Sequence, residues 1–448
     1  SINLSNVVNI YGDDSDDQIN LTSNISAKEI HVYGYAGDDS VTITGTMIAT
    51  DAFTINTGSG SDTVTITDAG TVSAGSVTVE TGSEGDTIQV DGTITATKAG
   101  TNTGIINFMT ASGADFVTVT GSVAAEDFII DAGDNDDIVT FDVDYDAEGR
   151  MLTGHIQVLG GDGTDLIAVN RLHTRLDTDV MDIDGQGGTD DVIINVRGGE
   201  TDYVINVIDT GAPDNGTDTL TINGTESDDV FLLRKNFVAY LTETGVDDDN
   251  RPVFAAEVER INYDSSINGR LAVSSGLGDD EFYVDDNSAI TTLDGGQGKD
   301  FFQIGQVFGT NPNGYDYDVD GKLDDPRVVA DGDEIELLQI TRGWLSQGIS
   351  YATTVFGGED GDTFNVYSNK AVLRLEGESG NDNFLIRAFI ADNDILANGG
   401  GNDDYFEYNI NAPVSINGGL GFDTVVAIGT EMADAFIITN EGIFGAGL

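Results

Sequence analysis

The sequence predicts an all-β protein: a right-handed parallel β-helix or β-roll of about 15 to 17 coils, each 20 to 29 residues long, interrupted by two inserts. Two observations carry this prediction. A glycine-rich turn that ends in aspartate returns along the whole chain, and apolar residues alternate with polar ones on both sides of each turn. A unit this short holds two or three strands and no crossover helix, so successive units must stack strand on strand.

The stretch 295–303, GGQGKDFFQ, shows the repeating unit most clearly. Its Asp300 is the last polar residue of the turn, and we call an aspartate in this register an anchor. The residues nine and seven positions before an anchor, and two and four after it, are apolar and are predicted to fill the interior. Fifteen anchors share the register: Asp17, Asp39, Asp62, Asp86, Asp115, Asp137, Asp165, Asp190, Asp229, Asp280, Asp300, Asp362, Asp382, Asp403 and Asp423.

Two long intervals between anchors predict the inserts. The first carries two strand-like stretches and is predicted to be an inserted hairpin, whose basic residues Arg234 and Arg260 offset local acid. The second holds Trp344 and an aspartate-rich loop. The predicted organisation of one elongated domain is therefore coils over 1–230, a hairpin over 231–275, coils over 276–304, an insert over 305–355 and coils over 356–448.

The net charge of the chain restricts the classes of molecule that it can bind. The chain has 79 acidic and 18 basic residues, a formal net charge of −61, which excludes nucleic acid and an anionic membrane surface as partners. No apolar run is long enough to span a membrane, and without cysteine no disulfide holds the fold. The acid gathers in the glycine turns rather than spreading over strand faces, which favours specific binding of cations.

Stacked turns would place successive anchor carboxylates about 5 Å apart, where two unit charges repel by about 3 to 4 kcal/mol at a protein surface. Ca²⁺ would offset this repulsion, because it accepts six to eight oxygen ligands in flexible geometry, whereas Mg²⁺ demands a stricter octahedron. The glycines permit the positive φ angles that turn carbonyls toward an ion. The alternative is that these are ordinary turns whose aspartates face solvent.

The motifs GGDGTDLIA (160–168), GGQGKDFFQ (295–303) and GGLGFDTVV (418–426) resemble the G-G-x-G-x-D-x-U-x nonapeptide of RTX, or haemolysin-type, calcium-binding proteins. The resemblance implies a β-roll of a protein exported from bacteria that folds on binding several Ca²⁺ ions, with the anchor aspartates and the glycine carbonyls as ligands. The chain departs from the family in having one glycine turn per coil instead of two, as in large surface adhesins and surface-layer proteins. The implied ligands are Asp39, Asp62, Asp86, Asp115, Asp137, Asp165, Asp190, Asp280, Asp300, Asp362, Asp382, Asp403 and Asp423.

A separate calcium loop is predicted in the second insert. Asp316, Asp318 and Asp320 reproduce the start of an EF-hand loop, and Asp324 stands at its ninth position. Its twelfth residue is Arg327 instead of the bidentate glutamate, so a lone Ca²⁺ is expected there without the usual flanking helices. The acidic stretch from Asp142 to Glu148 has similar spacing without the glycine, and a solvated loop is the equal alternative.

These features together predict a non-enzymatic, calcium-binding structural protein, secreted or on a cell surface: a surface-layer or filament subunit, or an adhesin stalk. Strand-like sequences at both ends predict self-association or continuation into neighbouring domains, and surface polysaccharide is a further candidate partner. The alternative is a β-helix enzyme, a lyase or epimerase acting on acidic polysaccharide. His31, His155 and His173 are far apart in the sequence, and strand or surface roles explain them without catalysis.

Overall fold

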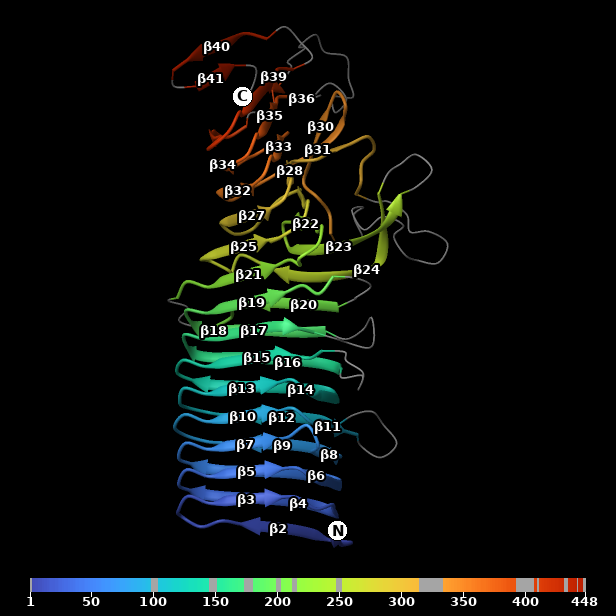
Figure 1. The fold of residues 1–448 in the computed structure, drawn as a ribbon, viewed down its shortest axis with the longest axis vertical. Helices are drawn as coiled ribbons and strands as arrows, with labels where there is room; N and C mark the ends of the chain where they lie inside the picture. Colours follow the sequence, from blue (N-terminus) through green and yellow to red (C-terminus); the bar gives the residue numbers. More distant parts are fainter. Residues whose placement is uncertain are drawn as a thin grey trace, which may run out of the picture. The chain divides into compact units, whose positions relative to one another are not determined.

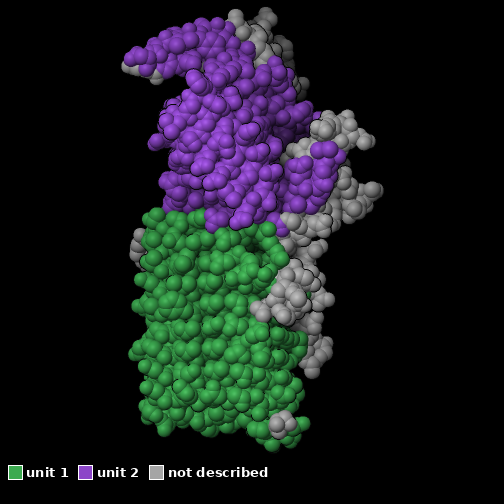
Figure 2. All heavy atoms as spheres, viewed as in Figure 1, with its two compact units in different colours: residues 1–197, 202–221 green, residues 198–201, 222–448 purple. Residues whose placement is uncertain are grey.

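A computed structural model of the chain describes residues 2–97, 104–144, 151–172, 180–198, 203–211, 216–246, 252–313, 333–391, 407–408, 411–430, 434–440 and 442–445. All regular structure in these ranges is β-strand. The chain forms two compact units (Figure 2): unit 1 comprises residues 1–197 and 202–221, and unit 2 comprises residues 198–201 and 222–448. The predicted boundaries of coils and inserts stay predictions. Among the described residues no helix is long and apolar enough to cross a membrane.

Unit 1 is a stack of parallel coils (Figure 1) in which each anchor separates two sets of strands. The strands that precede anchors are β1 (Ile2–Asn3), β2 (Val7–Tyr11), β4 (Ile25–Ala36), β6 (Thr46–Ser59), β8 (Thr71–Ala74), β9 (Ser76–Glu80), β11 (Thr93–Ala96), β12 (Ile105–Met109), β14 (Ser122–Asp134), β16 (Leu152–Gly163), β18 (Val180–Gly188) and β20 (Tyr203–Ile208). Those that follow anchors are β3 (Gln18–Leu21), β5 (Ser40–Ile43), β7 (Thr63–Ile66), β10 (Thr87–Val90), β13 (Phe116–Val119), β15 (Ile138–Asp142), β17 (Leu166–Arg171), β19 (Asp191–Asn195) and β21 (Thr219–Asn223).

The register of unit 1 confirms the predicted solenoid. Val41, Val64 and Ile88, each two residues after its anchor, are direct partners on the parallel strands β5, β7 and β10. All three are buried, as are Phe53 and Ile55 before Asp62. Alternation of apolar and polar residues therefore fixes which face of each strand is interior, because a slip by one residue would turn every side chain outward.

Unit 2 repeats the parallel arrangement with shorter coils and adds antiparallel strands. Strands β25 (Arg270–Ser274), β27 (Thr291–Gln297), β32 (Thr353–Glu359), β34 (Leu373–Ser379) and β38 (Val414–Asn417) precede anchors, while β22 (Val230–Arg234), β26 (Glu281–Val284), β28 (Phe301–Ile304), β33 (Thr363–Val366), β35 (Asn383–Arg387) and β39 (Thr424–Ile428) follow them. The remaining strands are β23 (Phe237–Val246), β24 (Pro252–Tyr263), β29 (Val307–Phe308), β30 (Leu337–Ile340), β31 (Gly343–Ser346), β36 (Ile390–Ala391), β37 (Glu407–Tyr408), β40 (Phe436–Thr439) and β41 (Gly442–Gly445).

A column of phenylalanines fills the interior of unit 2. Phe231, Phe282, Phe302, Phe364 and Phe384 each stand two residues after an anchor, and each is at most 1% exposed. Successive ring centroids are 5.4, 4.9, 5.1 and 4.6 Å apart, with interplanar angles of 19° or less. Each stacked pair contributes about 0.5–1.5 kcal/mol beyond the burial of its area.

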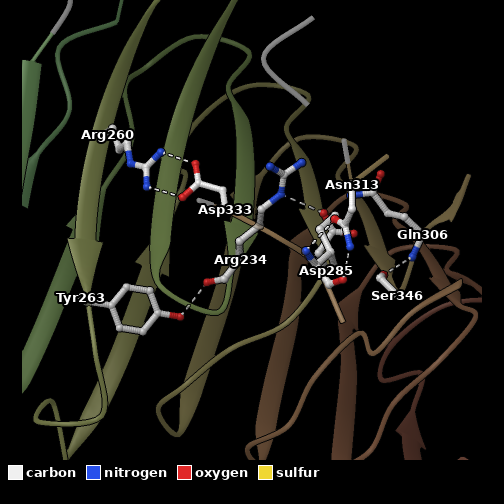
Figure 3. Close-up of polar contacts among 9 residues, drawn as sticks. Arg234, Arg260, Tyr263, Asp285, Gln306, Asn313, Asp333 and Ser346 are labelled. Atoms are coloured by element: carbon white, nitrogen blue, oxygen red, sulfur yellow. Dashed lines mark hydrogen bonds and ion pairs between the residues drawn. The ribbon is translucent and has the colours of Figure 1, made fainter. Parts of the chain in front are cut away.

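Two segments within the regions predicted as inserts meet inside unit 2 (Figure 3). β23 and β24 pair antiparallel, and Arg260 on β24 forms two hydrogen bonds, of 2.7 and 3.0 Å, with Asp333 of the second region. The Arg260 guanidinium lies 4.0 Å from the ring centroid of Phe237. Arg234 pairs with the fully buried Asp285 at 3.1 Å. These pairs confirm that both arginines offset local acid; they line or border a cavity of about 100 Å³.

Candidate metal centre

Most of the turns before the anchors share one backbone conformation. In them, residues four and two positions before the anchor take positive φ angles, as at Gly296 (90°) and Gly298 (133°) before Asp300, whereas the turns of Asp17 and Asp229 lack these angles. A Cβ added to Gly298 would lie 1.6 Å from the Gly278 carbonyl oxygen, because successive turns are stacked in close contact. All positive-φ residues other than glycine among the described residues occupy these same two positions: Tyr35, Glu84, Ala111, Asn135, Gln186, Asp360 and Glu378.

The anchor carboxylates point into the turns and form a hydrogen-bond ladder along each unit. The backbone N–H of Asp280 donates to Asp300 Oδ1 at 2.9 Å, and the N–H of Asp300 donates to Asp362 Oδ1 at 2.9 Å. Thirteen such bonds span 2.6–3.2 Å. The acceptors are Asp39, Asp62, Asp86, Asp115, Asp137, Asp165, Asp190 and Asp218 in unit 1, and Asp280, Asp300, Asp362, Asp382 and Asp423 in unit 2.

The second carboxylate oxygen of most anchors is buried and accepts no hydrogen bond of good geometry. This holds for Oδ2 of Asp39, Asp62, Asp86, Asp115, Asp137, Asp165, Asp190, Asp280, Asp300, Asp362 and Asp382. The ionisation of these carboxyl groups depends mainly on burial, and then on hydrogen bonds and on the charge of neighbouring anchors. Burial raises the pKa of Asp300 to about 7 and the pKa of Asp362 to about 8. A buried anion with an unpartnered oxygen requires a donor or a cation.

A second ladder runs in the opposite direction, one residue before the anchors. Asp228 Oδ1 accepts the N–H of Asp279 at 2.9 Å, and Asp279 Oδ1 accepts the N–H of Lys299 at 2.9 Å. In unit 1, Asp38 Oδ1 likewise accepts the N–H of Ser61 at 2.9 Å. A turn with aspartate before its anchor is therefore tied to the coil on either side by a carboxylate, and much of the turn acid serves as a hydrogen-bond acceptor for backbone amides.

The turns offer oxygen ligands of the kind that Ca²⁺ prefers. Beside Gly295, a position where a Cβ would stand lies 2.2 Å from Asp300 Oδ2 and 2.7 Å from the Gly357 carbonyl oxygen, so the missing side chain leaves a carboxylate and a carbonyl facing one another. No group of three or more His, Asp or Glu side chains converges anywhere in the described ranges. An ion in these turns would therefore be held by anchor carboxylates together with backbone carbonyls, a donor set that suits Ca²⁺.

The structure brings most of the predicted ligands into these ladders and leaves others untested. Asp403 and the EF-hand-like loop with Asp316, Asp318, Asp320 and Asp324 lie outside the described residues, as does the stretch 145–150. Asp144 forms a 2.6 Å hydrogen bond with Arg171 Nη1, and Asp142 also pairs with Arg171. That end of the acidic stretch is thus ion-paired on the surface of the solenoid.

His155 has partners that the sequence did not suggest. Its Nδ1 lies 3.2 Å from Asp127 and its Nε2 lies 2.8 Å from Asp182, on the neighbouring coils. The hydrogen bond to Asp182 is the main cause that raises the pKa of His155. Also unforeseen were the ladder one residue before the anchors and the stacking of the phenylalanines. Two signals for these features were available in the sequence. Asp recurs one residue before the anchors, and Phe recurs two residues after the later anchors.

Comparisons with known proteins add little to this picture. No family model matches the chain, and no curated protein matches it. Among solved structures, a hyperactive, Ca²⁺-dependent, β-helical antifreeze protein from an Antarctic bacterium is 16% identical, with coverage of 67% of this chain and 76% of that chain and a TM-score of 0.30. A likeness of this size carries no argument about function. The assignment as a parallel β-solenoid rests on the strand pairings, and the resemblance to RTX repeats stays a prediction from motifs.

Proposed function

We propose that this chain is a calcium-stabilised, non-enzymatic structural segment of a secreted or cell-surface bacterial protein, such as a surface-layer or filament subunit or an adhesin stalk. The single observation that supports this best is the column of buried anchor carboxylates, most of which have an oxygen that accepts no hydrogen bond from the described residues. Because the ladders run along many coils, calcium ions would bind at many turns. They would then be structural components of the fold and not ligands of one special site.

The donor set favours an extracellular setting. Calcium affinity rises with the number of charged ligands and the rigidity of the site, and extracellular modules bind with dissociation constants of about 10⁻⁴–10⁻³ M. A turn whose side-chain contribution is its anchor carboxylate belongs at the weak end of the scale. Such a protein would hold its ions in a calcium-rich exterior and lose them inside a cell, which would delay folding until after export.

The test is thermal unfolding followed by circular dichroism, in millimolar CaCl₂ and in excess EGTA. Ten sites, each at ten times its dissociation constant, would together stabilise the fold by about 14 kcal/mol, so we expect a fall in Tm on the order of tens of degrees in EGTA. Mg²⁺ should not restore it. Equal melting curves in CaCl₂ and EGTA would refute the proposal.

A matched pair of variants assigns the effect to the anchors. Asp300→Asn keeps an oxygen that accepts the Asp280 N–H but removes the charge, so it should weaken the calcium response. Asp279→Asn removes one charge at an exposed position of the neighbouring turn and serves as the control. If both variants change the calcium midpoint equally, general charge neutralisation is the cause and specific ligation by the anchors is wrong.

The surroundings of His155 support a non-catalytic role. An enzyme that acts on acidic polysaccharide needs a cationic group to neutralise the substrate carboxylate beside its base. His155 stands between Asp127 and Asp182, two carboxylates that would repel such a substrate. Incubation with alginate and pectate should therefore give no unsaturated product and no epimerisation. Turnover that His155→Gln abolishes would establish the enzyme alternative.

Exposed apolar side chains at the last described coil support association with another protein surface. Phe422 is 90% exposed, Leu420 is 75% exposed and Ile438 is 74% exposed. Large exposed apolar side chains that gather in one region of a soluble protein favour an interaction site there. We expect self-association, or packing against a neighbouring domain, to cover them. Light scattering of the wild type and of Phe422→Ser in calcium tests self-association: a monomer in both cases would remove it.

A further inference from the structure

The residue five positions before the anchor is glycine or carries a hydroxyl in all described turns of the fifteen anchors except that of Asp137, which has the buried Ala132. Most of these turns have glycine there: Gly12, Gly34, Gly160, Gly185, Gly224, Gly295, Gly357, Gly377 and Gly418. Four have a hydroxyl side chain instead: Thr57, Thr81, Thr110 and Ser275, all at most 1% exposed. Three of the four are consecutive, in the turns of Asp62, Asp86 and Asp115, and we call this the threonine block.

In the glycine turns, two acceptors face one another across a space without a side chain. A Cβ placed on Gly34 would lie 2.0 Å from Asp39 Oδ2 and 2.6 Å from the carbonyl oxygen of Thr57 in the next coil. At Gly160 the corresponding distances, to Asp165 Oδ2 and the Gly185 carbonyl oxygen, are both 2.6 Å. A buried carboxylate facing a carbonyl is unfavourable unless a donor or a cation lies between them.

In three of the four hydroxyl turns, the side chain supplies a donor to that carbonyl, whereas the buried Thr81 hydroxyl makes no hydrogen bond of good geometry. Thr110 Oγ1 donates to the Ala132 carbonyl at 2.6 Å, and Ser275 Oγ donates to the Gly295 carbonyl at 2.8 Å. Thr57 Oγ1 makes the same bond to the Thr81 carbonyl at 3.3 Å. The acceptor is in each case the next-coil carbonyl that faces the open space in glycine turns.

The hydroxyl also lies beside the anchor of its own coil. Burial is the main influence on the pKa of Asp115 and raises it, while hydrogen bonds from the Asp86 N–H and from the Thr110 hydroxyl lower it. The Oδ2 atoms of the anchors in the hydroxyl turns accept no hydrogen bond of good geometry in this arrangement. A hydroxyl hydrogen can rotate from the carbonyl toward the carboxylate, however, so each hydroxyl offers a donor to either acceptor without an ion.

We propose that the residue five positions before each anchor decides whether that turn needs calcium: glycine turns depend on the ion, whereas the threonine block is held by its own hydroxyls. The inference rests on the proposed calcium dependence and specifies which turns need the ion. Coils around β7, β10 and β13 would form a calcium-independent nucleus from which the fold spreads as ions bind to the glycine turns, in keeping with the nearest-neighbour stability of repeat proteins.

Hydrogen exchange of the full chain, followed by mass spectrometry in CaCl₂ and in EGTA, tests the inference. In EGTA the amides of β7, β10 and β13 should stay protected, while those of β17, β28 and β33, which follow glycine turns, exchange at least about tenfold faster than in calcium. Uniform loss of protection in EGTA would overturn this inference and leave the proposed function standing. Uniform retention in EGTA would overturn both.

Substitutions separate the hydroxyl from general packing. Thr110→Val keeps the shape and removes the donor, so β13 should lose protection roughly tenfold in EGTA. Thr54→Val on the outward face of β6 is the control and should change nothing. Thr57→Gly should make protection of β7 dependent on calcium, with full protection restored by CaCl₂. Equal behaviour of Thr110→Val and Thr54→Val would refute the role of the hydroxyl.

The reciprocal variant keeps the proposal testable if the threonine variants fold poorly. Gly160 does not adopt a positive φ, so Gly160→Thr places a hydroxyl between Asp165 and the Gly185 carbonyl once the Asp165 side chain and the Gly185 backbone both shift. We expect β17 to gain protection in EGTA and to lose its calcium response. A β17 that still requires calcium would contradict the proposal.

Discussion

Units 1 and 2 build the same coil with different means of support. In unit 1 the interior two residues after each anchor is aliphatic, and a coil can carry three short strands, as β7, β8 and β9 do. In unit 2 that interior position is a phenylalanine column, and the buried Asn287 ties a turn together by accepting the N–H of Ser350 at 2.8 Å and of Tyr351 at 2.9 Å. The threonine block lies in unit 1 alone among the described turns.

The difference shows that the same hydrogen-bond ladder can be stabilised by different interactions in different parts of the chain. The anchor bonds are alike in both units, so differences in stability must come from the interior and from the position five residues before the anchor. Unit 1 places hydroxyl side chains in three successive turns, and those of Thr57 and Thr110 donate to the next coil. Unit 2, where Ser275 is the only hydroxyl at that position in a described turn, relies more on stacked rings and on ions.

The largest expected effect is a separation of the units by calcium removal. In EGTA, differential scanning calorimetry should resolve two transitions, with unit 2 melting first, because more of its turns lack an internal donor. In calcium the transitions should merge or approach one another. A single transition displaced as a whole by EGTA would show that the two units respond alike and would remove the distinction.

The next effect concerns the interior. Phe302→Leu removes a ring stacked on both sides, so it should cost about 1–3 kcal/mol. Ile88→Leu in unit 1, a volume-conserving change at the equivalent position, should cost less than about 1.5 kcal/mol. Both are measured by denaturant unfolding in saturating calcium. Equal costs would show that stacking adds nothing beyond burial.

The pH dependence should affect both units alike. Burial raises the pKa of Asp190 to about 7 in unit 1 and of Asp300 to about 7 in unit 2, above the ordinary value of 3.8. Between these values the folded state binds more protons than the unfolded state, so without calcium stability falls as pH rises from about 4 to about 7 or 8. Melting in EGTA at pH 5 and pH 8 checks this: a higher Tm at pH 8 would contradict it. Calcium should flatten the dependence.

The smallest effect concerns the outer ladder. Asp279→Ala removes the acceptor of the Lys299 N–H and should cost about 0.5–1.5 kcal/mol, while Asp279→Asn, which keeps an acceptor oxygen, should be nearly neutral. Asp38→Ala and Asp38→Asn make the same comparison in unit 1 through the Ser61 N–H. If the asparagine variants lose as much stability as the alanine variants, charge and not hydrogen bonding is what these aspartates contribute.

Periodicity was enough to predict the solenoid, because burial of one strand face leaves a two-residue period that Leu293, Phe302 and Ile304 display around Asp300. The direction of the anchor carboxylates could not be predicted in the same way. The sequence spacing of a turn aspartate is the same whether its side chain faces solvent or lies under the glycine of its own turn. The direction of the side chain is determined by how the backbones of successive turns stack. The role of Thr57 could not be predicted for a related reason: its hydroxyl donates to a carbonyl of the next coil, 24 residues away.

The two opposed ladders also determine how the protein would yield to force. A turn with aspartate before its anchor, such as that of Asp280, is bonded to one neighbour through its anchor and to the other through the preceding residue, so a pull on the chain ends must break both kinds of bond before that coil is released. Coils would then leave one at a time from an end. A coil of 20 residues, such as that between Asp280 and Asp300, lengthens the chain by about 70 Å when extended. A stalk built this way would absorb mechanical work in regular steps and recover its length coil by coil as tension falls.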